Sequence, residues 1–349
     1  MKLFGKQFLM VAFLGGALLA PALHAETPAY VPISPEAQVT DMGQGVNIAA
    51  GWDPYWADQP SRFKLSQIDA IKAAGFRTIR IPITTFAHMD AQGHLDPATF
   101  KKLDRIVDAA VANGLNVIID EHDYDDCPKN VDACAVILPN IWYELSAHYK
   151  DASNLVMFEL LNEPHEKLDA DIWNSWLPDL IAIVRETNPT RNIIVGPTHW
   201  NSLDDLPLLK LPADDQHLIV TYHYYQPFMF THQGASWAGA EAMAAHDVHW
   251  TGKPEEVAAI NADFDRVAAW SKANNRPILL GEYGTYGKVN KNMNERAAWT
   301  KAVTDAAAAR GFARAFWYFD EGPDGFTAFN SDTNAWVEPI KDALLEKKP

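Results

Sequence analysis

Cysteine and positive charge are both scarce in this sequence of 349 residues. The chain has only two cysteines, Cys127 and Cys134, without paired histidines near them, so a structural zinc site is a poor interpretation. Lysine and arginine number 29 against 45 aspartates and glutamates, which gives a net charge of −16. This acidity argues against nucleic acid or an anionic membrane surface as a partner, and it suits a neutral or cationic one.

The first 25 residues differ in composition from the rest of the chain. Two lysines precede an uncharged apolar run over residues 8–20, and small residues follow it. This order is typical of a secretory signal peptide, with cleavage expected after Ala25 or after Ala22. The run is short for a membrane span, which needs ~20 apolar residues, so we expect no stable membrane association. We predict a signal peptide over residues 1–25 and a mature chain over residues 26–349 that is secreted or periplasmic.

Export would bring the two cysteines into an oxidising compartment. We therefore expect a disulfide between Cys127 and Cys134, with two unpaired thiols as the alternative. On the chain-entropy model, a bridge across so short a loop would stabilise the fold by roughly 2.5 kcal/mol.

Eight short hydrophobic runs recur from Gln44 onward, each followed by a polar loop and a helical pattern. Most runs are nearly continuous, which is typical of parallel strands buried on both faces. The helical patterns carry end signals, as at residues 96–114, where Asp96 and Pro97 open the segment and Gly114 follows it. The expected strands cover residues 44–52, 78–83, 116–122, 155–164, 192–198, 218–225, 277–284 and 313–320.

Eight strands alternating with helices in one stretch of this length predict an α/β protein with a single (β/α)8 TIM barrel domain. We see no linker, low-complexity tract or second domain. The competing architecture is a doubly wound open sheet, which should carry a glycine-rich phosphate loop after its first strand. The sequence at that point is "GWDPYW", without such glycine spacing.

Carboxylates end two of the expected strands. Asn162 and Glu163 follow the hydrophobic run in "FELLNEP", and Glu282 follows the one in "PILLGE". The carboxyl ends of barrel strands meet at one face, so the two acids can converge there. Two acids that flank a glycosidic bond are the working parts of a glycoside hydrolase. Glu159 lies two pleats behind Glu163, deeper in the barrel, and we interpret it as structural.

Five more polar or aromatic side chains lie at or near other strand ends: Arg80, His122, His223, Tyr225 and Trp317. Each alone has an ordinary structural explanation, such as an arginine that pairs with a buried acid or a histidine that packs. Together with Glu163 and Glu282 they mark six strand ends, and this coincidence favours one shared site.

The segments "LVMFELLNEP", "GFRTIRIPI", "HYY" and "GEYG", in this order, resemble glycoside hydrolase family 5, the cellulase-type family of retaining β-glycosidases in clan A. The resemblance covers nearly the whole mature chain. It implies that Glu163 is the general acid/base and Glu282 the nucleophile, and that Arg80 and Tyr225 keep the nucleophile ionised and oriented.

The resemblance also implies substrate contacts. Asn162 would bond the sugar 2-hydroxyl, His122 and His223 would line the cleavage subsite, and Trp317 would lie under the sugar ring. No cofactor is implied, and the histidine spacings match no metal-ligand motif, so we expect no required metal.

Aromatic side chains in the expected loops form a further set of candidates. Trp52, Trp56, Trp200 and Trp237 fall in strand-to-helix loops, and flat aromatic faces can cover pyranose rings. We prefer Trp200 and Trp237 as such platforms, against ordinary loop packing. A long segment, residues 226–252, follows the sixth strand, and we expect it to wall the cleft.

The sequence therefore predicts a secreted retaining β-glycoside hydrolase, an endo-β-1,4-glucanase acting on a β-linked polysaccharide or oligosaccharide. A β-mannanase or a mixed-linkage β-glucanase is the nearest alternative, and endo against exo action stays open. A metal-dependent barrel hydrolase is more remote, since the first strand has no His-x-His. A catalytically dead sugar-binding protein is disfavoured because both carboxylates are present. A monomer is the default expectation.

Overall fold

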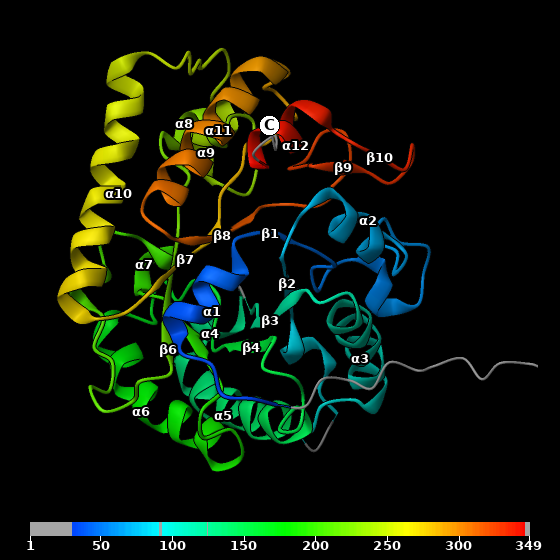
Figure 1. Ribbon diagram of the computed structural model, residues 1–349, viewed down its shortest axis with the longest axis vertical. Helices are drawn as coiled ribbons and strands as arrows, with labels where there is room; N and C mark the ends of the chain where they lie inside the picture. Colours follow the sequence, from blue (N-terminus) through cyan, green and yellow to red (C-terminus); the bar gives the residue numbers. More distant parts are fainter. Residues whose placement is uncertain (1–29, 91–92, 124, 346–349) are drawn as a thin grey trace, which may run out of the picture.

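The computed structural model describes residues 30–90, 93–123 and 125–345 (Figure 1). The expected signal peptide and its cleavage site lie outside the described residues. Within the described ranges, none of the helices is both long enough and apolar enough to cross a membrane.

Eight parallel strands close into a barrel in chain order, with β1 paired to both β2 and β8. The expected (β/α)8 architecture is therefore confirmed. The strands are β1 (Gln44–Asn47), β2 (Thr78–Ile83), β3 (Asn116–Glu121), β4 (Val156–Glu159), β5 (Ile193–Val195), β6 (Leu218–His223), β7 (Ile278–Glu282) and β8 (Ala313–Phe316).

Helices surround the barrel (Figure 1). They are α1 (Pro35–Met42), α2 (Gln67–Ala74), α3 (Pro97–Ala112), α4 (Asp126–Lys129), α5 (Val131–His148), α6 (Ala170–Thr187), α7 (Thr198–Asn201), α8 (Phe228–Thr231), α9 (Gly239–Ala244), α10 (Pro254–Asn274), α11 (Met293–Ala309) and α12 (Glu338–Leu344). Helix α3 begins as its sequence predicts, because the Asp96 side chain accepts from the Ala98 N–H and Pro97 occupies the first turn. A two-stranded sheet of β9 (Phe329–Asn330) and β10 (Ala335–Trp336), with α12, follows the last barrel strand and was not predicted.

The barrel interior changes from apolar to polar along its axis. At the amino-terminal end of the strands, one apolar cluster joins Val39 and Met42 of α1 to Ile118, Met157, Ile194, Ile219, Leu279 and Ala313. Two residues further along three of these strands stand Asp120, Glu159 and Thr221, all fully buried. Because alternate strand residues face the same side, these polar groups form the next layer inside the barrel. The polar layer leads directly to the carboxyl-terminal mouth.

Several strands are shorter than the hydrophobic runs predict. β1 ends at Asn47 instead of residue 52, and β4 ends at Glu159 instead of residue 164. The chain leaves the ladder there, and Glu163 adopts a φ of 45°, a left-handed conformation that costs a non-glycine residue roughly 1–3 kcal/mol. The side chains expected at strand ends therefore include several, such as Glu163 and Trp317, that lie just past them.

Candidate active site

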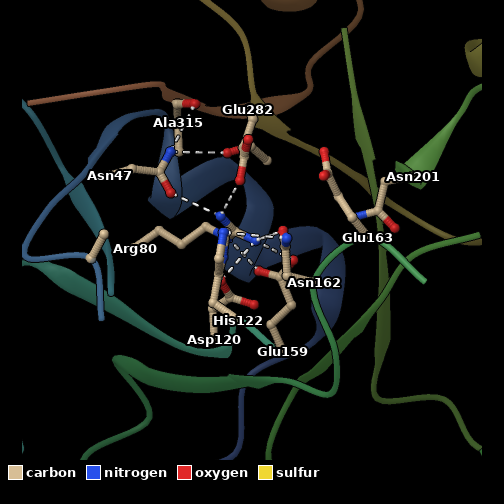
Figure 2. Close-up of polar contacts among 12 residues, drawn as sticks. Asn47, Arg80, Asp120, His122, Glu159, Asn162, Glu163, Asn201, Glu282 and Ala315 are labelled. Atoms are coloured by element: carbon tan, nitrogen blue, oxygen red, sulfur yellow. Dashed lines mark hydrogen bonds and ion pairs between the residues drawn. The ribbon is translucent and has the colours of Figure 1, made fainter. Parts of the chain in front are cut away.

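Arg80, on β2, is fully buried at the centre of the polar side chains (Figure 2). Its Nε and Nη2 donate to the two carboxylate oxygens of Glu159 at 2.7 and 2.9 Å. Nη2 also lies 2.9 Å from Asp120 Oδ2, and Nη1 donates to Glu282 Oε1 at 2.8 Å. Burial works against the charge of Arg80, but the three carboxylates together raise its pKa above the ordinary value. Burial raises the pKa of Asp120 to about 7, although Arg80 acts in the opposite direction.

Two amides hold the guanidinium from other sides. Asn47 Oδ1 accepts from Arg80 Nη1, and Asn162 Oδ1 accepts from Nη2, both at 2.9 Å. Asn47 Nδ2 in turn donates to the Gly281 carbonyl on β7 at 3.1 Å. Asn162 Nδ2 lies 3.3 Å from His122 Nε2. With its oxygen bonded to Arg80, this amide still has N–H hydrogens to offer a ligand.

Glu163 and Glu282 meet at His223. His223 Nδ1 lies 2.6 Å from Glu163 Oε1 and 3.6 Å from Glu282 Oε2, and the Tyr225 hydroxyl donates to Glu282 Oε2 at 3.0 Å. One oxygen of each glutamate and one nitrogen of His223 lie within 4.8 Å of one another. The two side chains keep 14% and 6% of their surface exposed, so both reach the barrel mouth.

The surroundings raise the pKa of both glutamates. Burial raises the pKa of Glu163 to about 7, and His165 and Arg80 oppose it only in part. Burial also raises the pKa of Glu282, while His223 and Arg80 act in the opposite direction. Only Glu282 has a direct bond to the guanidinium, and Glu163 has none. The pair therefore combines an acid that can stay protonated near neutral pH with a carboxylate held by a permanent cation.

His122 lies between the polar layer and the aromatic side chains. Its Nδ1 is 2.7 Å from Asp120 Oδ2, and its ring stacks on Trp317 with centroids 5.5 Å apart and an angle of 11°. Burial lowers its pKa to about 3, so the ring is neutral. Trp52 adds a second indole, 5.7 Å from the His122 ring and 5.9 Å from Trp317. With 56% of its surface exposed, Trp52 presents an open aromatic face to solvent.

Trp200 and Trp237 stand on the segments that follow β5 and β6. The Trp200 ring stacks on His165 at 4.9 Å, and the Trp200 backbone N–H donates to the carbonyl of Pro164, directly after Glu163. It also lines a cavity of about 670 Å³ between the loops that follow β4 and β5. Trp237, in the long segment after β6, stands edge-on to Tyr286 at 4.6 Å. Both tryptophans are exposed, so each can offer ring surface to a ligand.

This arrangement of strand ends matches a known family. A family model described as Cellulase (glycosyl hydrolase family 5) matches residues 39–322. The chain belongs to glycosyl hydrolase family 5. Endoglucanase H from Acetivibrio thermocellus is 30% identical over 322 residues, which are 90% of this chain and 34% of that protein. The chain thus spans about a third of the length of this curated relative.

Solved structures of family 5 enzymes share the fold. A hyperthermophilic endo-beta-1,4-glucanase in complex with substrate superposes with a TM-score of 0.84 and 33% identity, covering 90% of this chain and 100% of that chain. Thermotoga maritima Cel5A in complex with mannotriose superposes with a TM-score of 0.83 and 30% identity, covering 89% of this chain and 100% of that chain.

The sequence pointed to most of the site but not to Asn47, Asp120 or Asn201, and Trp52 was only a less preferred candidate. Asn47 and Asp120 bind Arg80, Trp52 contacts Trp317, and Asn201 lies 3.3 Å from His223. Asp120 had a usable signal, since it stands two residues before His122 on one face of a strand. Asn201 had none, because it lies in a segment that the sequence marks only as a short connection.

Within the described ranges, three side chains bring potential metal ligands close enough together to hold an ion. They are Glu163, His223 and Glu282. Two carboxylate oxygens and an imidazole nitrogen would suit a divalent cation. In this family 5 chain the His223 nitrogen already bonds Glu163 at 2.6 Å. An ion would have to replace that bond.

A disulfide joins Cys127 and Cys134, as the sequence analysis expects. It links α4 to α5 close to the end of β3. Asp123, just after His122, accepts from the Cys127 N–H at 2.7 Å. The bridge therefore braces the loop that carries His122 in this family 5 fold.

Proposed function

We propose that this chain is a retaining endo-β-1,4-glucanase in which Glu163 is the acid/base and Glu282 the nucleophile. The observation that carries the proposal is the approach of the two carboxyl groups, with oxygens within 4.8 Å. Retaining glycosidases hold their carboxyl groups about 5–5.5 Å apart, whereas inverting enzymes need roughly 6.5–9.5 Å to admit a water between them.

In the first step, protonated Glu163 gives its proton to the glycosidic oxygen as the bond to the anomeric carbon breaks. Ionised Glu282 attacks that carbon from the opposite face and forms a covalent glycosyl ester. The raised pKa of Glu163 supports the donor role. The bonds from Arg80 and Tyr225 to Glu282 favour its ionised form against the effect of burial and orient the carboxylate.

In the second step, Glu163 is ionised and takes a proton from water. As it loses this proton, the water oxygen attacks the anomeric carbon, and the ester bond to Glu282 breaks. Two inversions restore the starting configuration, and both carboxyl groups return to their first protonation states. Asn162, whose oxygen is held by Arg80, donates to the sugar 2-hydroxyl as positive charge develops in the ring.

The aromatic side chains support a chain of pyranose rings as substrate. Trp317 stacks on His122, and Trp52, Trp200 and Trp237 present exposed rings. The name of Endoglucanase H and of the endo-beta-1,4-glucanase structure supports β-1,4-glucan. The mannotriose complex of Thermotoga maritima Cel5A makes β-mannan the second candidate.

A panel of polysaccharides tests this proposal. Carboxymethylcellulose, barley glucan and mannan would be incubated with the enzyme, and new reducing ends measured together with the fall in viscosity. We expect release from both glucans, with an early loss of viscosity that marks internal cleavage. Activity on mannan alone would reject the glucanase assignment.

The stereochemistry and the metal requirement are tested on the same reaction. We expect NMR to find the β-anomer as the first product, and an α-anomer would overturn the double displacement. The proposed chemistry uses only side chains, so activity should survive dialysis against EDTA. Loss that zinc or calcium restores would favour a metal-dependent hydrolase.

We further propose that the protein is exported and acts as a monomer. The expected signal peptide over residues 1–25 supports export, and the Cys127–Cys134 bridge suits an oxidising compartment. Mass spectrometry of protein from the culture medium and periplasm should find a chain that begins after Ala22 or Ala25. Size-exclusion chromatography with light scattering should give the mass of one chain. An uncleaved chain in the cytoplasm, or a larger mass, would contradict these expectations.

A further inference from the structure

Asn201 is a fully buried residue with an unusual backbone. His199, Trp200 and Asn201 have φ values of 58°, 58° and 53°, so the short element α7 is a left-handed turn. Three consecutive non-glycine residues in this region are unfavourable, because their Cβ atoms crowd the backbone. The turn brings the Asn201 side chain to the site, where Figure 2 draws it on the same side of the view as Glu163.

The Asn201 amide contacts the histidine that joins the two glutamates. Asn201 Nδ2 lies 3.3 Å from His223 Nε2, and His223 Nδ1 on the other side of the ring lies 2.6 Å from Glu163 Oε1. An amide nitrogen can only donate, so Nε2 must accept. Burial lowers the pKa of His223 to about 4, which leaves a single ring hydrogen. That hydrogen is then on Nδ1, between Glu163 and Glu282.

The opposite orientation of the amide is less favourable. It would place Oδ1 against Nε2 and leave both Asn201 N–H groups where Oδ1 now lies. It would also put the ring hydrogen on Nε2, and the Nδ1 lone pair would then face Glu163 Oε1 at 2.6 Å and Glu282 Oε2 at 3.6 Å. The observed orientation leaves Asn201 Oδ1 unpaired among the described residues and keeps the bond to His223.

Gly196 makes room for this amide. A Cβ atom at residue 196 would collide with Asn201 Oδ1 and crowd the rest of the amide. Gly196 has no positive φ, so its backbone alone does not require glycine. The close approach of the amide supplies the requirement instead.

We propose that Asn201 is a positioning residue that fixes the tautomer of His223, so that Nδ1–H is directed at Glu163 and Glu282. This inference rests on the proposed function of that pair. In the resting enzyme the Nδ1–H group bonds Glu163. During the reaction it remains a donor beside whichever carboxylate is ionised, first Glu282 and then Glu163. The opposite tautomer would present a lone pair to a carboxylate and repel it.

Isosteric and remote substitutions separate this role from simple packing. In Asn201→Asp the carboxylate can only accept, so we expect a hydrogen on His223 Nε2. In Gly196→Ala the new methyl group displaces the amide and should also abolish the single tautomer. For both variants we expect kcat/KM on cellotetraose to fall about 10- to 100-fold, a typical effect of losing the partner that orients a site histidine.

Asn192→Ala is the matched control. Asn192 is also buried, at the start of β5, and its Nδ2 donates to Gln38 Oε1 at 3.2 Å far from the glutamates. Its Oδ1 is also without a partner among the described residues. Loss of this amide should lower stability and leave the His223 tautomer and kcat/KM unchanged.

The direct measurement is long-range 1H–15N NMR on protein labelled at its 12 histidines, with the His223 signals assigned from a His223→Gln sample. We expect a protonated Nδ1 and an unprotonated Nε2 in the wild type. A protonated Nε2 in the wild type would overturn the proposal. It would also be overturned if Asn201→Asp and Gly196→Ala kept the His223 tautomer and the kcat/KM of the wild type. The spectra need no substrate, so a protein inactive on every glycan would refute the proposed function and leave the tautomer result readable.

Discussion

Replacement of Glu163 by glutamine is the most informative single change to this protein. Glutamine has nearly the same shape and its oxygen can still accept from His223 Nδ1, which lies 2.6 Å from Glu163 Oε1. The variant should therefore fold normally and lose only proton transfer. General acid/base catalysis contributes about 10²- to 10⁴-fold, so kcat/KM on cellotetraose should fall by that factor.

The pH dependence gives the magnitude that belongs to Glu163 itself. Its pKa rises from the ordinary 4.5 to about 7 because the side chain is buried. At pH 6 a group with a pKa of 7 is about 90% protonated, whereas a group with a pKa of 4.5 is about 3% protonated, a roughly 30-fold gain in the active form. The donor form is present below the raised pKa and lost above it. Wild-type kcat/KM should therefore decline above about pH 7 with a slope of one proton.

Two substrates separate the two steps. An aryl cellobioside with a good leaving group needs little proton donation, so Glu163→Gln should nearly keep its kcat/KM, while kcat falls because water loses its base. With cellotetraose as substrate, both kcat/KM and kcat of Glu163→Gln should fall. The assay is initial rate against pH for each substrate, with circular dichroism as the check on folding. An alkaline limb that persists unchanged in Glu163→Gln, or equal losses on both substrates, would refute the assignment of Glu163 as acid/base.

Three further outcomes are expected. Glu282→Gln should abolish turnover while sugar binding, measured by calorimetry, remains; undiminished turnover would refute its role as the nucleophile. A Cys127→Ser, Cys134→Ser double variant should lose about 2.5 kcal/mol of unfolding free energy in urea titration, from the entropy of a short loop, and an unchanged midpoint would contradict that. Trp52→Ala should raise the KM for cellotetraose about fivefold, which corresponds to the loss of ~1 kcal/mol of ring contact. Tyr143 is an exposed aromatic residue on α5, and Tyr143→Ala should leave KM unchanged. Equal effects of the two changes would argue against a sugar platform at Trp52.

The barrel itself could be predicted from the order of residues. Continuous hydrophobic runs alternating with capped helical segments are local patterns, and each maps onto a strand such as β3 or a helix such as α3. The positions of strand ends were less predictable. Glu163 was expected on a strand, but its left-handed φ depends on where the chain must leave the barrel to bring the carboxylate to the mouth.

The two glutamates, Arg80 and Tyr225 were also accessible from sequence, because they stand at or near the carboxyl ends of expected strands and these ends converge. The prediction that Glu159 is structural agrees with its burial and its bonds to Arg80. Trp200 and Trp237 were preferred over Trp52, yet Trp52 is the loop tryptophan in contact with Trp317. Loop composition alone does not say in which direction an indole points.

The sequence by itself determined which side chains reach the mouth of the barrel, because strand periodicity and chain order fix that. Only the tertiary structure decided how these side chains are paired. The bond of Asn47 to the Gly281 carbonyl spans 234 residues, and Asn201 reaches His223 through a left-handed turn fitted against Gly196. Such contacts depend on the distance and direction of groups brought together by closure of the barrel, and no local pattern of residues encodes them.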